Sequence, residues 1–180
     1  MPGTVGRGEM DDPVIVVEYD PTWEKTFRTL RGGIAAALNG LIVSIEHVGS
    51  TSIPGVAAKP IIDMDVVVRS LDDIPRAIGR LSALGYEHQG DLGIAGREAF
   101  ESPGGSPNHH LYLCSVESQE LRRHIVFRDY LRDHPDEARR YSELKKSLAA
   151  EHRNDRKAYT EAKTEFVNCI LVKVESSLDQ

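Results

Sequence analysis

The stretch HVGSTSIPGVAAKPIIDMDVVV (residues 47–68) joins a glycine–serine turn to an apolar strand that carries two aspartates, Asp63 and Asp65. Side chains alternate between the two faces of a strand, so the two carboxylates share one face, roughly 7 Å apart at their Cα atoms. Met64 and Val66 then point to the opposite face, into a core. A strand that only packs against a core does not need two carboxylates, so the stretch predicts a functional site.

The residue types of this stretch suit a metal ion and a phosphate group. Mg²⁺ is usually held by one or two carboxylates together with water and substrate phosphates, so we expect Asp63 and Asp65 to be catalytic, metal-binding residues. Glycine lets the backbone approach an oxyanion and hydroxyls add donors, so Gly49, Ser50 and Thr51 are predicted to hold phosphate. Two alternatives stand beside this interpretation: ordinary turn chemistry, and aspartates on the solvent face of an edge strand.

The composition is that of a soluble globular protein of ordinary size. The chain has 180 residues, 28% of them charged, and a net charge of −6, which argues against broad nucleic-acid binding. No apolar stretch approaches the ~20 residues that span a bilayer, no signal peptide is visible, and Cys114 and Cys169 form no metal-binding pattern. We therefore expect a cytoplasmic protein without a membrane partner, and the oligomeric state is left open.

The chain divides into a sheet-forming part and a helical part. Residues 1–13 are predicted to be a disordered tail, and residues 14–180 a single domain with a sheet core over about 14–116 and helices over about 117–178. The spacing of apolar residues predicts helices over residues 20–40, 70–85, 118–134, 136–153 and 155–178. Strands are predicted over residues 41–49, 61–68, 97–102 and 109–115, with 14–20 as an edge strand or an extended lead-in. This order of elements indicates an α+β fold.

The spacing of the turn and the two aspartates resembles a known signature. Gly49-Ser50, a dozen intervening residues and then Asp63-x-Asp65 are similar to the motif of the nucleotidyltransferase superfamily, which includes DNA polymerase β and the aminoglycoside nucleotidyltransferases. The resemblance implies that Gly49 and Ser50 form a phosphate loop. It also implies that Asp63 and Asp65 are the first two metal-binding carboxylates.

A closer resemblance, to the GrpB family (also called UPF0157), runs from about Val17 to about Leu171. It rests on the segments VEYDPTW, IEHVGSTSIPGVAAKPIIDMDVVV, LGYEHQG, FRDYLRDHPDEARRYSELKKSLA and DRKAYTEAKTEFV. It implies a nucleotidyltransferase-like mixed β-sheet with flanking helices and a C-terminal helical extension. A related domain is fused to dephospho-coenzyme A kinase in some proteins, which points to nucleotide or coenzyme A metabolism.

Active members of the superfamily carry a third carboxylate on a later strand, which corresponds here to NHHLYLC and contains no acid. In the GrpB family this strand typically reads His-Leu-His, so His110 fits the resemblance and Tyr112 departs from it. His110 is predicted to be catalytic, as a neutral metal ligand or a proton shuttle, with a satisfied core histidine as the alternative. Glu98 or Glu101, on the preceding strand, is an alternative source of the missing acid.

Basic side chains complete the predicted phosphate site. Lys59 lies in the loop four residues before Asp63, Arg97 is expected to point into the same cleft, and Arg128 suits a bidentate phosphate contact. Lys145 and Lys163 lie on the C-terminal helices, whose polar residues are interpreted mainly as interhelical structure, with a few lining the cleft.

The sequence therefore predicts a Mg²⁺-dependent, nucleotidyltransferase-like protein that binds a nucleoside triphosphate and moves a nucleoside monophosphate onto a hydroxyl acceptor. The first alternative is a catalytically inactive module of the same fold that binds a nucleotide, a coenzyme A derivative or another phosphorylated small molecule, and the missing acid favours it. The second alternative is an interaction protein built on the C-terminal helices.

Overall fold

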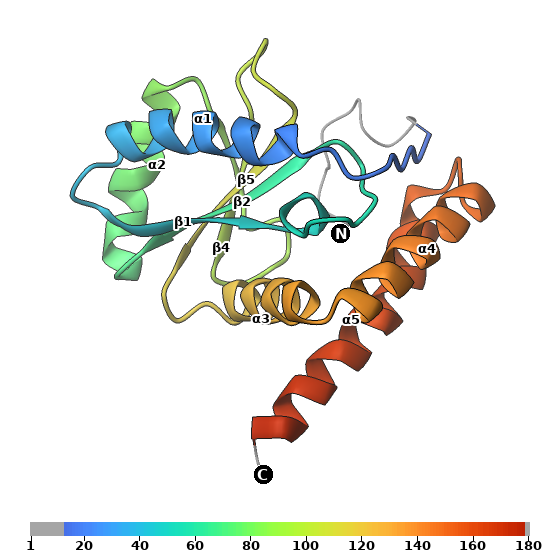
Figure 1. The fold of residues 1–180 in the computed structure, drawn as a ribbon. Helices are drawn as coiled ribbons and strands as arrows, with labels where there is room; N and C mark the ends of the chain where they lie inside the picture. The colour runs from blue at the N-terminus through green and yellow to red at the C-terminus, as the bar shows by residue number, and fades with distance from the viewer. Residues whose placement is uncertain (1–12, 179–180) are drawn as a thin grey trace.

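The structure is a computed structural model that describes residues 13–178, and within them it contains a five-stranded mixed sheet with helices on both faces (Figure 1). The predicted tail, residues 1–13, lies outside the described residues except for its last residue. In chain order the elements are α1 (Thr22–Ala37), β1 (Ile42–Val48), a 3-10 turn (Ser50–Ser52), β2 (Ile62–Val68), a second 3-10 turn (Leu71–Asp73), α2 (Ile74–Ala83), β3 (Glu87–Gly90), β4 (Arg97–Glu101), β5 (His109–Ser115), α3 (Gln119–Asp133), α4 (Pro135–Glu151) and α5 (Arg156–Leu178).

The sheet has the order β1-β2-β5-β4-β3, with β2 and β5 parallel and the other neighbouring pairs antiparallel. The parallel pair needs a crossover connection, which α2, β3 and β4 supply between β2 and β5. The mixed sheet and the surrounding helices confirm the predicted α+β fold. Because β2 has a neighbour on each side, it is an inner strand, and the alternative of an edge strand for the two aspartates is wrong.

One face of the sheet forms the main hydrophobic core under α1 and α2 (Figure 1). Phe27 and Ile34 of α1 pack there, and Met64 and Val66 of β2 have no exposed surface. The alternation predicted for β2 is therefore confirmed on its apolar side. The opposite face is covered by α3, where Leu121 packs on Val67 and Cys114.

Helices α4 and α5 form an antiparallel pair beside α3, and α5 continues past α3 toward the C-terminus (Figure 1). Apolar residues of the loop before β2, Ile53 and Val56, pack with Phe127 of α3, Tyr141 of α4 and Ile170 of α5. This second core fixes the helical pair against the loop that leads from β1 to β2. It therefore places two helices beside the end of β2 at which Asp63 lies.

The segment before α1 is an extended lead-in. Val17 and Ala58 exchange two backbone hydrogen bonds of 2.9 Å, and this isolated bridge is the segment's only assigned sheet pairing within the described residues. None of the helices in residues 13–178 combines the length and the apolar character that a membrane crossing requires.

Candidate functional site

The face of the sheet beneath α3 carries the polar side chains that the sequence predicted. In the strand register, Asp63 lies opposite His110 of β5, and Asp65 lies opposite Tyr112. Residues directly opposite in neighbouring strands point to the same face, so these four side chains share it. The two aspartates thus face away from the main core, as their spacing predicted.

Asp63 is held by a histidine of the neighbouring strand. The Nδ1 atom of His110 donates a hydrogen bond of 2.8 Å to Oδ1 of Asp63. Burial would raise the pKa of Asp63, but the hydrogen bond and the charges of His110 and Lys163 outweigh it, so the pKa lies below its usual value. Asp63 is therefore an ionised carboxylate whose second oxygen faces the turn at Gly49.

Gly49 is required by the geometry of this turn. Its φ of 69° lies in the left-handed region, and a Cβ atom at this position would clash with Oδ2 of Asp63. The following residues form the short 3-10 turn, in which the hydroxyl of Ser52 donates to the carbonyl of Gly49 at 2.6 Å. The glycine–serine turn and the first aspartate of the strand are therefore in direct contact, as the sequence predicted for neighbouring strands.

Thr51 is turned inward from the same turn. Its side chain is buried, its Oγ1 lies 3.0 Å from Nε2 of His47, and it donates to the carbonyl of Ile61 at 3.3 Å. These contacts tie the turn to β1 and to the start of β2. Thr51 borders the cleft, but its hydroxyl is already used inside the protein.

Asp65 lies deeper and is closed off from solvent by α3. Only 2% of it is exposed, and its Oδ2 accepts a hydrogen bond of 2.7 Å from Nδ1 of His124. The other ring nitrogen of His124 lies 3.4 Å from Glu120. Burial lowers the pKa of His124, but the hydrogen bonds to both carboxylates outweigh it and raise the pKa to about 9. The pair is therefore an imidazolium and a carboxylate.

A cleft of about 290 Å³ opens between the Asp63 end of the sheet and the helices α4 and α5. Ser50, Asp63 and His110 line it from the sheet side. Its basic lining residues come from the loop before β2 and from both helices: Lys59, Lys145, Arg156 and Lys163. Asp63 is the single carboxylate among the lining residues, so the cleft has an excess of positive charge suited to an anion.

Lys145 is the most unusual member of this set. It is 1% exposed, and its Nζ atom has no hydrogen-bond partner among the described residues. The amine lies 4.7 Å from the centre of the Tyr141 ring. Burial is the main cause that holds the pKa of Lys145 well below its usual value, and the charge of Lys163 adds to it.

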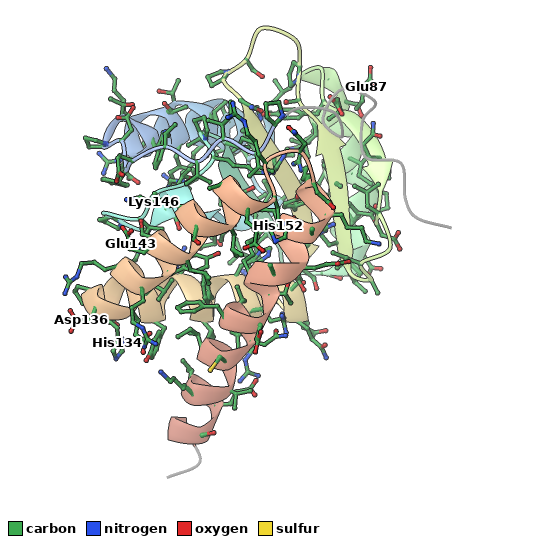
Figure 2. All side chains as sticks on the ribbon, turned by 90° about the vertical axis from the view of Figure 1, so that its right-hand side faces the viewer. Glu87, His134, Asp136, Glu143, Lys146 and His152 are labelled. Atoms are coloured by element: carbon green, nitrogen blue, oxygen red, sulfur yellow. The ribbon has the colours of Figure 1, made fainter. Side chains whose placement is uncertain are left out.

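The next residue along α4 behaves like an ordinary surface lysine. Lys146 forms ion pairs of 2.7 Å with Glu18 and 3.1 Å with Glu143, both on the outside of the protein. Figure 2 looks onto α4 and α5 and labels Lys146 and Glu143 on α4. Lys145 was predicted, with other polar residues of the C-terminal helices, to be mainly interhelical structure, and no role was predicted for Lys146. Helical spacing distinguishes Lys145 from Lys146, because Lys145 lies on the same buried helix face as Tyr141, Leu148 and Ala149.

The structure brings together part of the predicted site. The predicted residues that line the cleft are Ser50, Thr51, Lys59, Asp63 and His110, and Gly49 contacts Asp63. Besides Gly49, three predicted residues lie outside the lining, namely Asp65, Arg97 and Arg128.

Both arginines make contacts within the protein. Arg97 lies over the Tyr112 ring, 4.2 Å from its centre. Arg128 donates to Glu46 at 2.9 Å and to the carbonyl of His47 at 3.1 Å. They support the polar face of the sheet rather than the cleft itself.

The alternative acids on β4 do not complete a metal site. Glu98 lies opposite Leu113, on the apolar face, and pairs with His88 at 2.6 Å. Glu101, at the end of β4, is exposed and is absent from the cleft lining. Neither carboxylate stands beside Asp63 as the missing third acid.

Magnesium was predicted from Asp63 and Asp65, and the donor atoms in this arrangement do not fit it. Across residues 13–178, no group of three or more His, Cys, Asp or Glu side chains is placed to hold a metal ion. Asp63 is engaged by His110 and Asp65 by His124, so two imidazoles occupy the positions around the carboxylates. Magnesium stays a prediction, and no chemical step is derived through it.

Comparison with known proteins adds the family. Residues 13–173 match the profile of the family described as GrpB protein. The chain belongs to the GrpB family. Among GrpB relatives, the glutamate-rich protein GrpB of Alkalihalophilus pseudofirmus is 35% identical over 172 residues, which cover 93% of this chain and 97% of that protein. The UPF0157 protein YqkA of Bacillus subtilis is 38% identical over 154 residues, covering 86% of this chain but only 45% of that protein.

Solved structures support the assignment to the GrpB family. The crystal structure of GrpB from Enterococcus faecalis superposes with a TM-score of 0.82 and 33% identity, covering 92% of this chain and all of that one. A Cid1 poly(U) polymerase structure with bound MgGTP matches at a TM-score of 0.53 and 17% identity, over 75% of this chain and 44% of that one. At 17% identity, the match to Cid1 shows only that the two proteins share a nucleotidyltransferase-type fold.

A GrpB-like region also occurs in a larger enzyme. This chain is 26% identical over 178 residues to the dephospho-CoA kinase of Mycolicibacterium paratuberculosis, covering 84% of this chain and 43% of that protein.

Proposed function

We propose that this GrpB-family chain binds a phosphorylated small molecule, with a nucleoside triphosphate as the first candidate, in the cleft between the sheet and helices α4 and α5. The observation that carries the proposal is the charge of the cleft. Three cationic side chains (Lys59, Arg156 and Lys163) and one carboxylate line it, together with Lys145, a buried amine without a hydrogen-bond partner in the described part of the chain. A buried unpaired amine is unfavourable in an empty protein, so its position favours a ligand that supplies an anion.

The turn beside the cleft supports the same ligand class. Gly49 leaves room for the Asp63 carboxylate and starts the turn that carries Ser50 to the cleft wall. Lys59 and Arg156 border the opposite rim, and charges placed in a narrow polar cleft attract anions over several ångströms. The volume of about 290 Å³ is at the lower end for small-molecule sites, which suits the phosphates of a nucleotide more than the entire molecule.

The comparisons make nucleotides the sensible first probes. A Cid1 structure of the same general fold is described with bound MgGTP, and a dephospho-CoA kinase contains a region similar to this chain. ATP and coenzyme A both carry phosphates that the cleft could accept. The choice of base or acyl carrier is left to the binding experiment.

The proposal is tested by calorimetric titration of ATP and of coenzyme A into the protein, in EDTA and again with Mg²⁺. We expect saturable binding of at least one of the two. The variant Lys163→Met should weaken it at least about tenfold, because it removes a charge from the cleft wall. Lys157→Met is the matched control, since Lys157 is exposed on the same helix and pairs only with Glu161 among the contacts recorded for it. The absence of saturable binding by either probe contradicts the proposal, and so does equal loss in both variants.

Nucleotidyl transfer is the second candidate. It is favoured by the Asp63 carboxylate, which lies in the cleft beside the Gly49-Ser50 turn within a nucleotidyltransferase-type fold. In such a transfer the oxygen of an acceptor hydroxyl forms a bond to the α-phosphorus of the triphosphate, the hydroxyl proton passes to solvent, and the bond to pyrophosphate breaks. Pyrophosphate release from ATP in a Mg²⁺ buffer that contains a small-molecule cell extract tests it. Release that is abolished in Asp63→Asn supports transfer, and binding without release supports a binding module.

A further inference from the structure

Lys145 has a place in the cleft that a phosphate-binding lysine does not need. An amine that only attracts phosphate does not need to be buried, and Lys59, which lines the same cleft, is only half-buried. Lys145 instead lies on the buried face of α4, 1% exposed, with its amine over the ring of Tyr141. The inference drawn here rests on the proposed function and concerns the protonation of this one amine.

The groups that face Lys145 come from every element around the cleft. Its own helix contributes the phenol of Tyr141. The sheet contributes one carboxylate, Asp63, which already accepts a hydrogen bond from His110. Helix α5 and the loop before β2 contribute Arg156, Tyr159, Lys163 and Lys59, and strand β5 contributes the imidazole of His110 and the phenol of Tyr112.

The balance of these groups disfavours a charged Lys145 in the empty cleft. Burial of an ammonium group without a partner is costly, and such a group normally loses its proton. The cation of Lys163 adds repulsion, and the single carboxylate nearby is shared with His110 and Lys163. The direction of the shift in the pKa of Lys145, well below the usual value, agrees with this geometry.

A phosphate group changes that balance. It would bring up to two negative charges and several acceptor oxygens to the amine, which borders the cleft. The protonated amine would then gain an ion pair and hydrogen bonds that the empty cleft does not offer. Binding of the anion and protonation of the amine would therefore favour each other.

We propose that Lys145 takes up a proton when the phosphate of the ligand enters the cleft, so that the cleft becomes a receptor for a terminal, doubly charged phosphate. In chemical terms, the neutral amine and one proton from solvent give the ammonium group, and no covalent bond to the ligand forms. A phosphodiester carries only one negative charge, so it would stabilise the newly formed ammonium group less. The ligand class is therefore a phosphate monoester or the end of a polyphosphate.

The experiment is calorimetric titration of ATP into the full chain at pH 8 in EDTA, in two buffers with different enthalpies of ionisation. The second ionisation of the terminal phosphate of ATP has a pKa of about 6, so this phosphate is already doubly charged at pH 8 and takes up no proton itself. The difference in binding heat between Tris and HEPES gives the number of protons taken up. We expect about one proton per ATP bound in the unmodified protein.

The variant Lys145→Met tests whether Lys145 is the group that takes up the proton. It should bind ATP at least about tenfold more weakly and with little proton uptake, whereas Lys163→Met should bind more weakly but still take up a proton. ATP binding without proton uptake in the unmodified protein overturns this inference and leaves the proposed function standing. Unchanged uptake in Lys145→Met overturns it as well. If ATP does not bind at all, both this inference and nucleotide binding fail.

A separate experiment tests whether the cleft prefers a doubly charged terminal phosphate. The γ-methyl ester of ATP has nearly the same size as ATP but one negative charge fewer at its end. We expect it to bind at least about tenfold more weakly than ATP and to take up less than half as many protons. Equal affinity and equal uptake for the two compounds overturn the assignment of a doubly charged terminal phosphate.

Discussion

The Nδ1 atom of His124 lies 2.7 Å from Oδ2 of Asp65, and this contact joins helix α3 to the inner strand β2. Asp65 is 2% exposed, so loss of its partner would leave a buried carboxylate unpaired. We predict that His124→Leu, which has no donor, lowers the free energy of unfolding by about 3 kcal/mol, as measured by urea denaturation. His88→Leu is the control, because it removes the more exposed pair with Glu98 and should cost under about 1 kcal/mol. Equal losses in the two variants would contradict the structural role of the first pair.

The same contact predicts a dependence of stability on pH. The pKa of His124 is raised from 6.5 to about 9 in the folded protein. The stabilisation that it provides is therefore complete below about pH 6.5 and is lost as the pH rises through about 9, up to about 3 kcal/mol in total. In urea denaturation between pH 6 and pH 10, the unmodified protein should lose up to about 3 kcal/mol more of its free energy of unfolding than His124→Leu does. Parallel profiles for the two proteins would refute it.

Gly49 offers a test of the contact between the turn and the site. We predict that Gly49→Ala is destabilised by more than about 2 kcal/mol, since alanine is strained at a φ of 69° and its Cβ meets the Asp63 carboxylate. Gly55→Ala is a matched control, because Gly55 also has a positive φ, 80°, but no atom lies within 4 Å of the added Cβ. It should lose only about 1–2 kcal/mol. If the two variants unfold at the same urea concentration, the close packing of Asp63 against the turn is not significant.

The hydroxyl of Thr51 is predicted to be structural. Thr51→Val keeps the shape of the side chain but removes its hydrogen bonds with His47 and Ile61, which leaves buried polar atoms unpaired. We expect a loss of about 1–3 kcal/mol in thermal or urea unfolding. Thr164→Val, at an exposed helical threonine that donates to the carbonyl of Thr160, should stay within about 0.5 kcal/mol. An unaffected Thr51→Val protein would instead favour the ligand role that the sequence first indicated.

We expect the buried amine of Lys145 to lower the free energy of unfolding of the ligand-free protein. Its buried amine has no hydrogen-bond partner within the described residues, so Lys145→Met should stabilise the ligand-free protein by roughly 0.5–2 kcal/mol. Because the pKa of Lys145 is depressed, the unfolded chain binds more protons at this site, and the advantage of the variant should shrink as the pH rises toward 10.5. Lys146→Met is the neighbouring control and should change stability by less than about 0.5 kcal/mol. A Lys145→Met protein that is less stable at pH 7 would contradict this.

Much of this architecture follows from local patterns in the sequence. The two-residue period of β2 was sufficient to predict that Asp63 and Asp65 share a face while Met64 and Val66 are buried, and both are confirmed. The helices and strands lie close to their predicted bounds for the same reason, since helical and strand periods are read over a few residues. Gly49 was predicted to let the backbone approach a phosphate, and its left-handed conformation beside the Asp63 carboxylate was not predicted.

The partners of the aspartates could not be predicted in the same way. His124 follows Asp65 by 59 residues, and the contact depends on how α3 crosses the sheet, which no local period encodes. Arg128 was expected at phosphate, but its position over β1 gives it Glu46 as a partner. Lys145 was read as one of several helical lysines, because its burial depends on the packing of α4 against α5.

The central claim is that a phosphorylated ligand binds between the Gly49-Ser50 turn and Lys145. The most direct test is a crystal structure of the protein with a non-hydrolysable ATP analogue, grown without divalent metal. We predict that a phosphate oxygen lies within about 3 Å of Nζ of Lys145 and that the phosphates occupy the cleft beside Ser50. A nucleotide bound elsewhere, with the amine of Lys145 still without an anionic partner, would contradict the account.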